Sequence, residues 1–434
     1  MPNKGSLECL SATAAAARLA TREVSAEDFA RACLARIAAR EGEVAAWAHM
    51  DPTSVLAQAR RLDSGAIRGV LHGLPVGIKD IIDTADMPTG YGSPIYAHNR
   101  PAWDAACVSA VRAAGGIVMG KTVTSELATS YRGKTRHPLN PAHTPGGSSS
   151  GSAAAVADFM TPLALGTQTG GATLRPSSFC GVVGYKPSFG LVNRHGVKQV
   201  SESLDTVGLI ARSVEDVALL AAAITGRPGL MRRKCAAPPR IGLWRTYEWA
   251  QAGPATVAAL ETAAQRLAAA GAMVREPAMP AEFGGLDAAH KEIQFFEMAR
   301  ALRFEFDHHA DLLSTSLRTS IEHGMRCTPE LYDEKRAVTQ QCRMLIDQQF
   351  AEFDVLLAPS APGEAPKGLE NTGSPVFNRG WTLLHLPCLT VPAFTGPNGL
   401  PVGVQLVGRY WNDATLLACA DWIAAHIGDA RSAP

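Results

Sequence analysis

Strand-like segments occur on both sides of a long helical block, and this arrangement limits the fold more than any other feature of the sequence. Before the block, short β-rich segments alternate with helices over residues 74–78, 105–114, 116–119 and 151–159. After it, strand-like residues return at 355–357, 388–391 and 402–407. Such alternation is typical of strands crossed by helices on both faces of a sheet. We therefore predict one α/β domain over residues 1–434, with a large twisted mixed sheet covered by helices.

Helix signals complete this outline. Ser25 and Asp28 form a capping-box signature before an amphipathic run, so we expect helices within residues 1–60. The helical block, about residues 285–352, is predicted to be an excursion from the same domain. Its last helix begins at Thr328 and Pro329, with proline at the first helical position. Further elements are expected as helices after Ser213, at 255–270 and at 413–427, as a strand at 241–244, and as a linker at 226–238.

Composition and charge argue against several classes of function. The formal net charge of +1 provides no basic footprint for nucleic acid or an anionic membrane. The nine cysteines include no CxxC pair and the twelve histidines no HExxH motif, so we predict neither a disulfide framework nor a metal site. The N-terminus lacks an apolar signal core, and no stretch is long enough to span a bilayer. We expect a cytoplasmic protein with a small-molecule substrate. The oligomeric state stays open, with a homodimer as one arrangement.

Two glycine- and serine-rich segments stand out, TPGGSSSGS at residues 144–152 and GTQTGGATLRP at 166–176. Small residues allow a backbone to approach a ligand closely, and helix-forming sequence beside them leaves backbone N–H groups free. Flexible linkers usually lie in polar surroundings, whereas dense apolar sequence flanks both segments at 153–156 and 163–165. We interpret them as buried functional loops.

With these segments the chain resembles the amidase signature enzymes, and the resemblance covers most of its length. The shared motifs are GIKD at 77–80, GGSSSGS at 146–152, the run from Gly166 to Gly171 leading to Cys180, GYKPS at 184–188 and GLPVGVQ at 399–405. Within the family, GTQTGG, RPSSFCG and NRGWTLLHLPC are most similar to malonamidase-like members. The resemblance implies the amidase signature fold and hydrolysis of the C–N bond of a small amide without a cofactor.

The resemblance also implies a role for each motif position. Lys79 corresponds to the lysine base, Ser148 to a serine that follows a cis peptide bond, and residue 172 to the nucleophile. A serine hydroxyl needs a base to take its proton, and lysine can be that base only when its surroundings favour the neutral amine. Ser148 would relay the proton, because a hydroxyl donates one hydrogen bond while it accepts another. The N–H groups of residues 169–172, including Thr169, Gly170 and Gly171, would form the oxyanion hole.

Residue 172 departs from the family pattern, because it is alanine. Lys79 and Ser148 are both retained, which favours an introduced serine-to-alanine change over natural loss of activity. We therefore expect this chain to keep the scaffold of an active hydrolase but to be nearly inactive itself.

Arg175 also needs an explanation, since it lies three residues after the nucleophile position. One interpretation is a fork for a substrate carboxylate, to which arginine is suited. The other is a structural arginine that binds local carbonyl oxygens.

Several alternatives remain. Carbamates, ureas and aryl amides share the planar carbonyl–nitrogen unit and would use the same triad. A non-catalytic protein that binds an amide or a partner would explain Ala172 alone, and a glutaminase component of an amidotransferase would need partner subunits. Residues 147–151 also fit the G-x-S-x-G nucleophile elbow with Ser149, but that motif needs a hydrophobic strand running into it, and a turn precedes it here. Phe377 and Trp381 are either core aromatics or walls of the substrate pocket.

Overall fold

The structure is a computed structural model that describes residues 5–232 and 234–428. Eleven strands of these residues form one sheet, in the order β1-β3-β2-β4-β6-β5-β10-β11-β9-β7-β8. The strands are β1 (Trp47–His49), β2 (Pro75–Lys79), β3 (Ile117–Thr122), β4 (Leu163–Gln168), β5 (Val183–Lys186), β6 (Thr206–Ala211), β7 (Arg240–Leu243), β8 (Met273–Arg275), β9 (Val355–Pro359), β10 (Cys388–Thr395) and β11 (Pro401–Val407). The three strands that follow the helical block, β9 to β11, lie in the middle of this order with earlier strands on both sides, so the predicted α/β fold with a large mixed sheet is confirmed.

The sheet is parallel in two groups of strands and antiparallel elsewhere. β2 pairs in parallel with β3 and β4, and β7 pairs in parallel with β8 and β9. The middle of the sheet, from β4 through β6, β5, β10 and β11 to β9, is antiparallel. Every residue of β2, β3, β4, β6 and β11 is buried, which explains their continuous runs of small and apolar residues.

The helices are α1 (Ala12–Ala20), α2 (Ala26–Val44), α3 (Pro52–Asp63), α4 (Ala106–Ala113), α5 (Ser150–Ala157), α6 (Leu174–Cys180), α7 (Val214–Thr225), α8 (Gly229–Arg232), α9 (Pro254–Ala269), α10 (Leu286–Ala301), α11 (Arg303–His309), α12 (Thr315–Arg326), α13 (Pro329–Gln349), α14 (Val376–Leu383) and α15 (Asp413–Ile427). α5 and α6 pack together on the sheet, and α7, α9 and α15 form a second covering group. No helix of the described ranges combines the length and apolar character that crossing a membrane requires.

The predicted helix starts are confirmed by their hydrogen bonds. The hydroxyls of Ser25, Ser213 and Thr328 each accept from the backbone N–H three residues later. α15 spans the predicted 413–427, and the predicted linker at 226–238 contains the short helix α8. The sequence prediction did not identify β1, β4, β5, β6, β8, α6 and α14. Residues 1–4 and 429–434 of the predicted domain lie outside the described residues.

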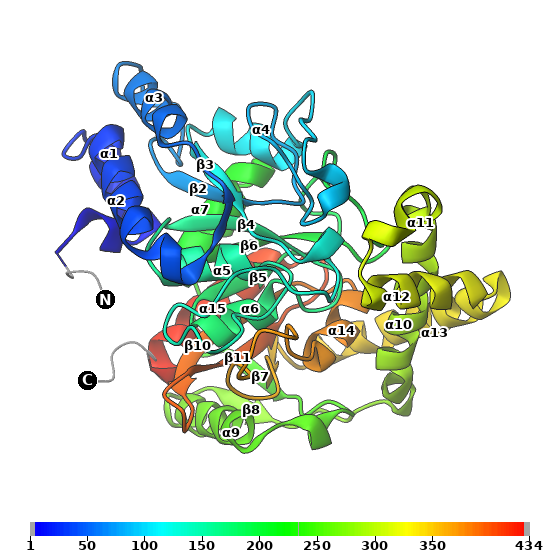
Figure 1. The fold of residues 1–434 in the computed structure, drawn as a ribbon. Coiled ribbons are helices and arrows are strands. Elements are labelled where there is room, and N and C mark those ends of the chain that lie inside the picture. Colours follow the sequence, from blue (N-terminus) through cyan, green and yellow to red (C-terminus); the bar gives the residue numbers. More distant parts are fainter. Residues whose placement is uncertain (1–4, 233, 429–434) are drawn as a thin grey trace.

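The helical excursion consists of α10 to α13, which Figure 1 shows projecting from one end of the sheet. Buried glutamates attach it to the rest of the domain. Glu305 of α11 accepts from the Tyr96 hydroxyl and binds the Lys198 amine, both at 2.6 Å. Glu126 accepts from the backbone N–H of Ser314, the residue that caps α12, at 3.0 Å. The excursion is therefore held on the domain by specific polar contacts as well as by packing.

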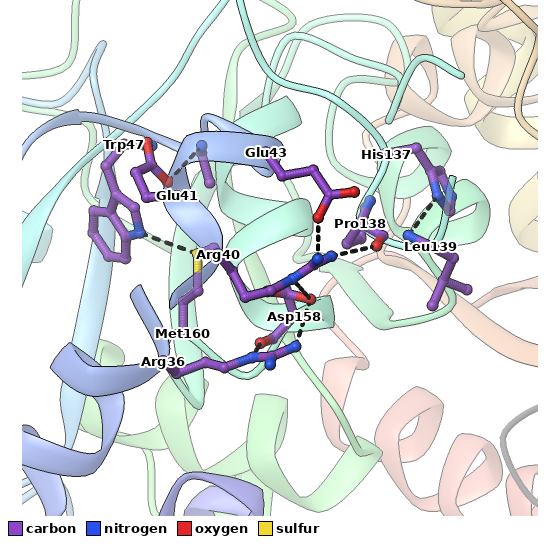
Figure 2. Close-up of polar contacts among 11 residues, drawn as sticks. Arg36, Arg40, Glu41, Glu43, Trp47, His137, Pro138, Leu139, Asp158 and Met160 are labelled. Carbon is purple, nitrogen blue, oxygen red and sulfur yellow. Dashed lines mark hydrogen bonds and ion pairs between the residues drawn. The ribbon is translucent and has the colours of Figure 1, made fainter. Parts of the chain in front are cut away.

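At the opposite side of the sheet, α2 is attached to the end of α5 by the ion pairs drawn in Figure 2. Arg36 donates to the Asp158 carboxylate at 2.8 Å and to its backbone carbonyl at 2.8 Å. Arg40 binds the same carboxylate at 3.2 Å, and its guanidinium also binds Glu43. Asp158 is the C-cap of α5 and its side chain is only 6% exposed, so two arginines compensate one buried charge.

We expect Asp158→Asn to lower the free energy of unfolding by about 2–3 kcal/mol, because it weakens charge-assisted hydrogen bonds to two arginines. Glu43→Gln is the matched control. It removes the negative charge of the more exposed acceptor of Arg40 and should change stability by less than about 1 kcal/mol. Urea denaturation of both variants measures the difference, and equal effects would contradict the assignment of Asp158 as the central acceptor.

Candidate active site

Three segments that are distant in sequence meet at the end of β2. Lys79 is the last residue of that strand, Ser148 lies just before α5, and residues 169–173 connect β4 to α6. β2 and β4 are parallel neighbours, so both chains leave the sheet at the same edge. The two glycine- and serine-rich segments are buried, as predicted, and their ends form α5, β4 and α6.

The amine of Lys79 lies in the interior with two hydroxyl partners. Its Nζ donates to Ser148 Oγ at 2.6 Å and to Thr167 Oγ1 at 2.7 Å, and the side chain is fully buried. Burial disfavours the charged form and lowers the pKa of Lys79 from 10.5 to about 7, although the charge of Asp205 opposes the shift. A lysine with this pKa is neutral in an appreciable fraction of molecules near neutral pH, as a general base must be.

The expected cis bond before Ser148 is not found. The peptide bonds of the described residues are all trans, including the one between Gly147 and Ser148. A trans bond is favoured by about 2.5–4 kcal/mol when the second residue is not proline. The contact between Ser148 and Lys79 forms with the trans bond, so this geometry does not require the cis form.

Residue 172 and Ser148 both line a cavity of about 300 Å³. The backbone N–H of Ser149 donates to the Ala172 carbonyl oxygen at 3.2 Å, which ties the two loops together. The cavity is lined by Ala128, Thr129, Ser130, Gly147, Ser148, residues 169–172, Arg175, Gln294, residues 371–375 and Arg379. The structure thus brings the three predicted catalytic positions, 79, 148 and 172, to one place.

The loop after β4 supplies backbone donors to this cavity. Gln168 Oε1 accepts from the N–H groups of Thr173 and Leu174, at 3.0 and 3.1 Å, and so satisfies the first donors of α6. The N–H groups of Gly170, Gly171 and Ala172 donate to no acceptor in the described part of the chain. A side chain at Gly171 is excluded, because its Cβ would lie 2.4 Å from Asn378 Oδ1. Unpartnered donors at a cavity are what an oxyanion hole requires.

Arg175 makes the local contacts expected of a structural arginine, and part of its guanidinium has no partner. Its Nη2 donates to the Gly147 carbonyl oxygen at 2.8 Å and to Thr372 Oγ1 at 3.2 Å, so it supports the loop that carries Ser148. Its Nε and Nη1 atoms are buried without a hydrogen-bond partner among residues 5–232 and 234–428, although the side chain lines the cavity. Burial, with a smaller effect from Arg379, lowers the pKa of Arg175 from 12.5 to about 9. Two unused donors on a buried cation are suited to an anionic ligand.

The nucleophile elbow with Ser149 is excluded. Its hydroxyl donates to the Thr167 carbonyl oxygen at 3.1 Å and accepts from the Thr167 N–H at 3.2 Å, so Ser149 joins α5 to β4. Phe377 and Trp381 do not line the cavity beside Ala172. They belong, with Trp244, to a separate cavity of about 30 Å³ on α14.

Several site residues were missed from sequence. Thr167 is the second partner of Lys79, and Gln294 and Arg379 reach the cavity from α10 and α14. Thr167 lies in the glycine-rich segment 166–176, five residues before position 172. Its place in that segment was the signal that could have identified it. Gln294 and Arg379 depend on contacts across more than 100 residues, which no local pattern reveals. The described residues contain no cluster of three His, Cys, Asp or Glu residues that could hold a metal ion.

The pKa of Lys79 predicts how stability depends on pH. Between about pH 7 and about pH 10.5 the unfolded lysine is protonated while the folded lysine is neutral, so unfolding takes up a proton and stability rises with pH. Relative to Lys79→Met, the chain should therefore gain up to about 1.4 kcal/mol for each pH unit in this interval. Chemical denaturation of both proteins between about pH 6 and pH 9 measures the gain. A stability difference that is independent of pH would contradict the buried neutral amine.

Comparisons with known proteins identify the family of the chain. A family model described as Amidase matches residues 28–417. A glutamyl-tRNA(Gln) amidotransferase subunit of Chloroflexus aggregans is 33% identical over 468 aligned residues, which cover 96% of each chain. A crystal structure of an amidase superposes with a TM-score of 0.89 at 29% identity, covering 96% of this chain and 100% of that one. The native peptide amidase of Stenotrophomonas maltophilia gives a TM-score of 0.80 at 28% identity, with 96% and 97% covered. The chain belongs to the amidase family of amidase-signature hydrolases.

Proposed function

We propose that this scaffold hydrolyses the C–N bond of a small amide through Lys79, Ser148 and a serine at position 172, and that Ala172 replaces that serine. The observation that carries the proposal is the 2.6 Å contact between the buried Lys79 amine and the Ser148 hydroxyl, beside residue 172. A buried lysine in contact with a serine can act together with it to deprotonate a second hydroxyl, that of a nucleophile. The chain with alanine retains the base, the relay and the cavity, but has no nucleophile.

The chemistry follows from the order of these groups. Neutral Lys79 takes the proton of Ser148 as Ser148 takes the proton of the serine at 172, whose oxygen attacks the substrate carbonyl carbon. The N–H groups of residues 170–172 stabilise the oxyanion that forms. When the C–N bond breaks, the protonated relay returns the proton to the leaving nitrogen, which departs as an amine. Water then attacks the acyl-enzyme by the same relay and releases the acid.

The cavity limits the substrate. Its volume of about 300 Å³ is at the small end of ligand sites, which favours a small amide over a long chain. Arg175 and Arg379 both line it, and Arg379 is paired with Asp287 at 2.8 Å. Because Arg175 keeps two unused donors, we propose a carboxylate at the acyl end of the substrate, as in malonamidase-like members. A neutral carbamate or aryl amide is the alternative, with its carbonyl oxygens as acceptors.

A second candidate is glutamine hydrolysis within an amidotransferase complex. It is favoured by the 33% identity to a glutamyl-tRNA(Gln) amidotransferase subunit, over nearly the whole of both chains. Glutamine also carries a carboxylate that Arg175 would bind, so the two candidates differ in the rest of the substrate and in the need for partner subunits. A protein that binds an amide without cleaving it is the alternative outside catalysis, and Ala172 is its support.

We expect Ala172→Ser to increase hydrolysis of its best amide substrate by several orders of magnitude, since loss of a serine nucleophile costs about 10⁶ in rate in another hydrolase. The assay measures amine release from malonamic acids, glutamine, anilides and carbamates. Because only neutral Lys79 is a base, kcat/KM should rise with pH through the pKa of about 7 and then level off.

The double variant Ala172→Ser/Lys79→Met is the control, and it should lose most of the activity together with this rise. Equal turnover by the alanine and serine proteins would refute the assignment of residue 172. No turnover of any amide by Ala172→Ser would favour the non-catalytic alternative.

Arg175→Ala in the Ala172→Ser background separates the substrate classes. Truncating one partner of a buried charge pair typically costs about 2–5 kcal/mol, so a carboxylate substrate should lose kcat/KM selectively. For a neutral amide, kcat/KM should fall only by the amount that displacement of the Gly147 loop causes. The quantity to measure is the ratio of kcat/KM for an acidic and a neutral amide, with and without the substitution. An unchanged ratio would overturn the carboxylate assignment and favour a neutral amide or carbamate.

A further inference from the structure

A buried carboxylate, that of Asp205, binds the loop after β4, and no cationic side chain of the described residues pairs with it. Asp205 precedes β6, the neighbour of β4, and is 6% exposed. Its Oδ1 accepts from the Thr169 hydroxyl at 2.5 Å, and its Oδ2 from the N–H groups of Val200 and Ser201 at 2.8 and 3.0 Å. Arg194 binds the backbone carbonyl oxygen of Asp205, at 2.9 Å, and not its carboxylate. A buried charge without an ion-pair partner is unfavourable, so its position needs an explanation.

Asp205 faces the same space as the second partner of Lys79. A cavity of about 10 Å³ on this side is lined by Thr167, Thr169 and Asp205, together with Arg194 and Lys198. The Thr167 hydroxyl that lines it also accepts from Lys79 at 2.7 Å. Asp205 and the threonine that binds the base therefore line the same small cavity.

Thr169 links Asp205 to the oxyanion donors. Its hydroxyl is bound by Asp205, and its carbonyl oxygen accepts from His290 Nε2 at 2.8 Å. Burial lowers the pKa of His290 to about 3, so the ring is neutral and its Nε2 carries the donated hydrogen. Thr169 is therefore fixed from two sides, directly before the three residues whose N–H groups face the cavity.

We propose that Asp205 is a positioning residue for the hydrolysis proposed above: it fixes the oxyanion loop through Thr169 and places a negative charge beside the Lys79 base. The role of the loop in catalysis rests on the proposed hydrolysis. The effect of Asp205 on Lys79 does not, because it can be measured without turnover. The alternative is that Asp205 only anchors the turn at residues 200–205.

The electrostatic surroundings support this assignment. The charge of Asp205 raises the pKa of Lys79, against the larger effect of burial. The other charged groups here are Arg194 and Lys198, which line the small cavity, and Arg175, which lines the catalytic one. Lys198 is paired with Glu305 at 2.6 Å. Asp205 is thus the carboxylate whose loss should favour the neutral amine further and move its titration to lower pH.

The first experiment uses the chain with Ala172. The titration midpoint of Lys79 is followed by NMR of ¹³C-labelled lysine, with Lys79→Met to assign the signal. We expect Asp205→Asn to lower the midpoint by less than about one pH unit, because the two groups are not in contact. Asp216→Asn is the matched control: Asp216 is a fully buried aspartate that binds Thr13 on α1, and its loss should leave the midpoint unchanged. A folded Asp205→Asn protein with an unchanged midpoint would overturn the proposal. Asp205→Ser provides the same measurement if the asparagine variant does not fold.

The second experiment tests the loop in the Ala172→Ser background. Thr169→Val removes the hydroxyl but keeps the carboxylate, so kcat should fall by at least tenfold with little change in KM, while the Lys79 midpoint stays in place. Thr169→Ser retains the hydrogen bond and should recover most of the rate. Unchanged kcat in Thr169→Val would overturn the role of the loop contact. If Ala172→Ser cleaves no amide, the proposed function fails, and the NMR titration still decides whether Asp205 acts on Lys79.

Discussion

Lys79 is the last residue of β2, a strand that is buried over its whole length, and its buried amine needs hydrogen-bond acceptors. Ser148 provides one acceptor from the loop before α5, at 2.6 Å, and Thr167 provides the other from β4, at 2.7 Å. Further contacts stabilise both segments. Arg175 donates to the Gly147 carbonyl oxygen, next to Ser148, and Gln168 accepts from the backbone of the loop after β4. The position of residue 172 and the shape of the cavity depend on these supports, so the surroundings of one buried lysine order much of the site.

Much of the fold could be predicted because its helices carry local signals. Caps at Ser25, Ser213 and Thr328 define helix starts within a few residues of sequence. β4 and β6 escaped prediction because every residue in them is buried and most are small or apolar, so they show no alternation of polar and apolar residues. β1 and β8 have three residues each, too few to form a pattern.

The site shows the same division between local and distant information. Lys79, Ser148 and position 172 were found from motifs, and the structure brings them together. The bond before Ser148 was expected to be cis from the resemblance alone, and it is trans in the structure. Asp205, Gln294 and Arg379 contact the site through tertiary packing, so no short stretch of sequence marks them. The hydrogen bond from Arg175 Nη2 to the Gly147 carbonyl oxygen likewise could not be predicted from a local sequence pattern.

The cavity has two walls that come from separate parts of the chain. The residues proposed to do chemistry, from Lys79 to Asp205, belong to one continuous stretch of the sheet and its loops. The facing wall comes from α10 and from residues 371–379, which contribute Gln294, Thr372 and Arg379. Substitutions or exchanged segments in this second wall would alter which acyl or amine groups fit, and leave the hydrogen bonds of Lys79 intact. A gene library that varies Gln294, residues 374–375 and Arg379 in a serine-172 background, and keeps His290 and Thr372, is therefore a direct route to new substrate ranges on this scaffold.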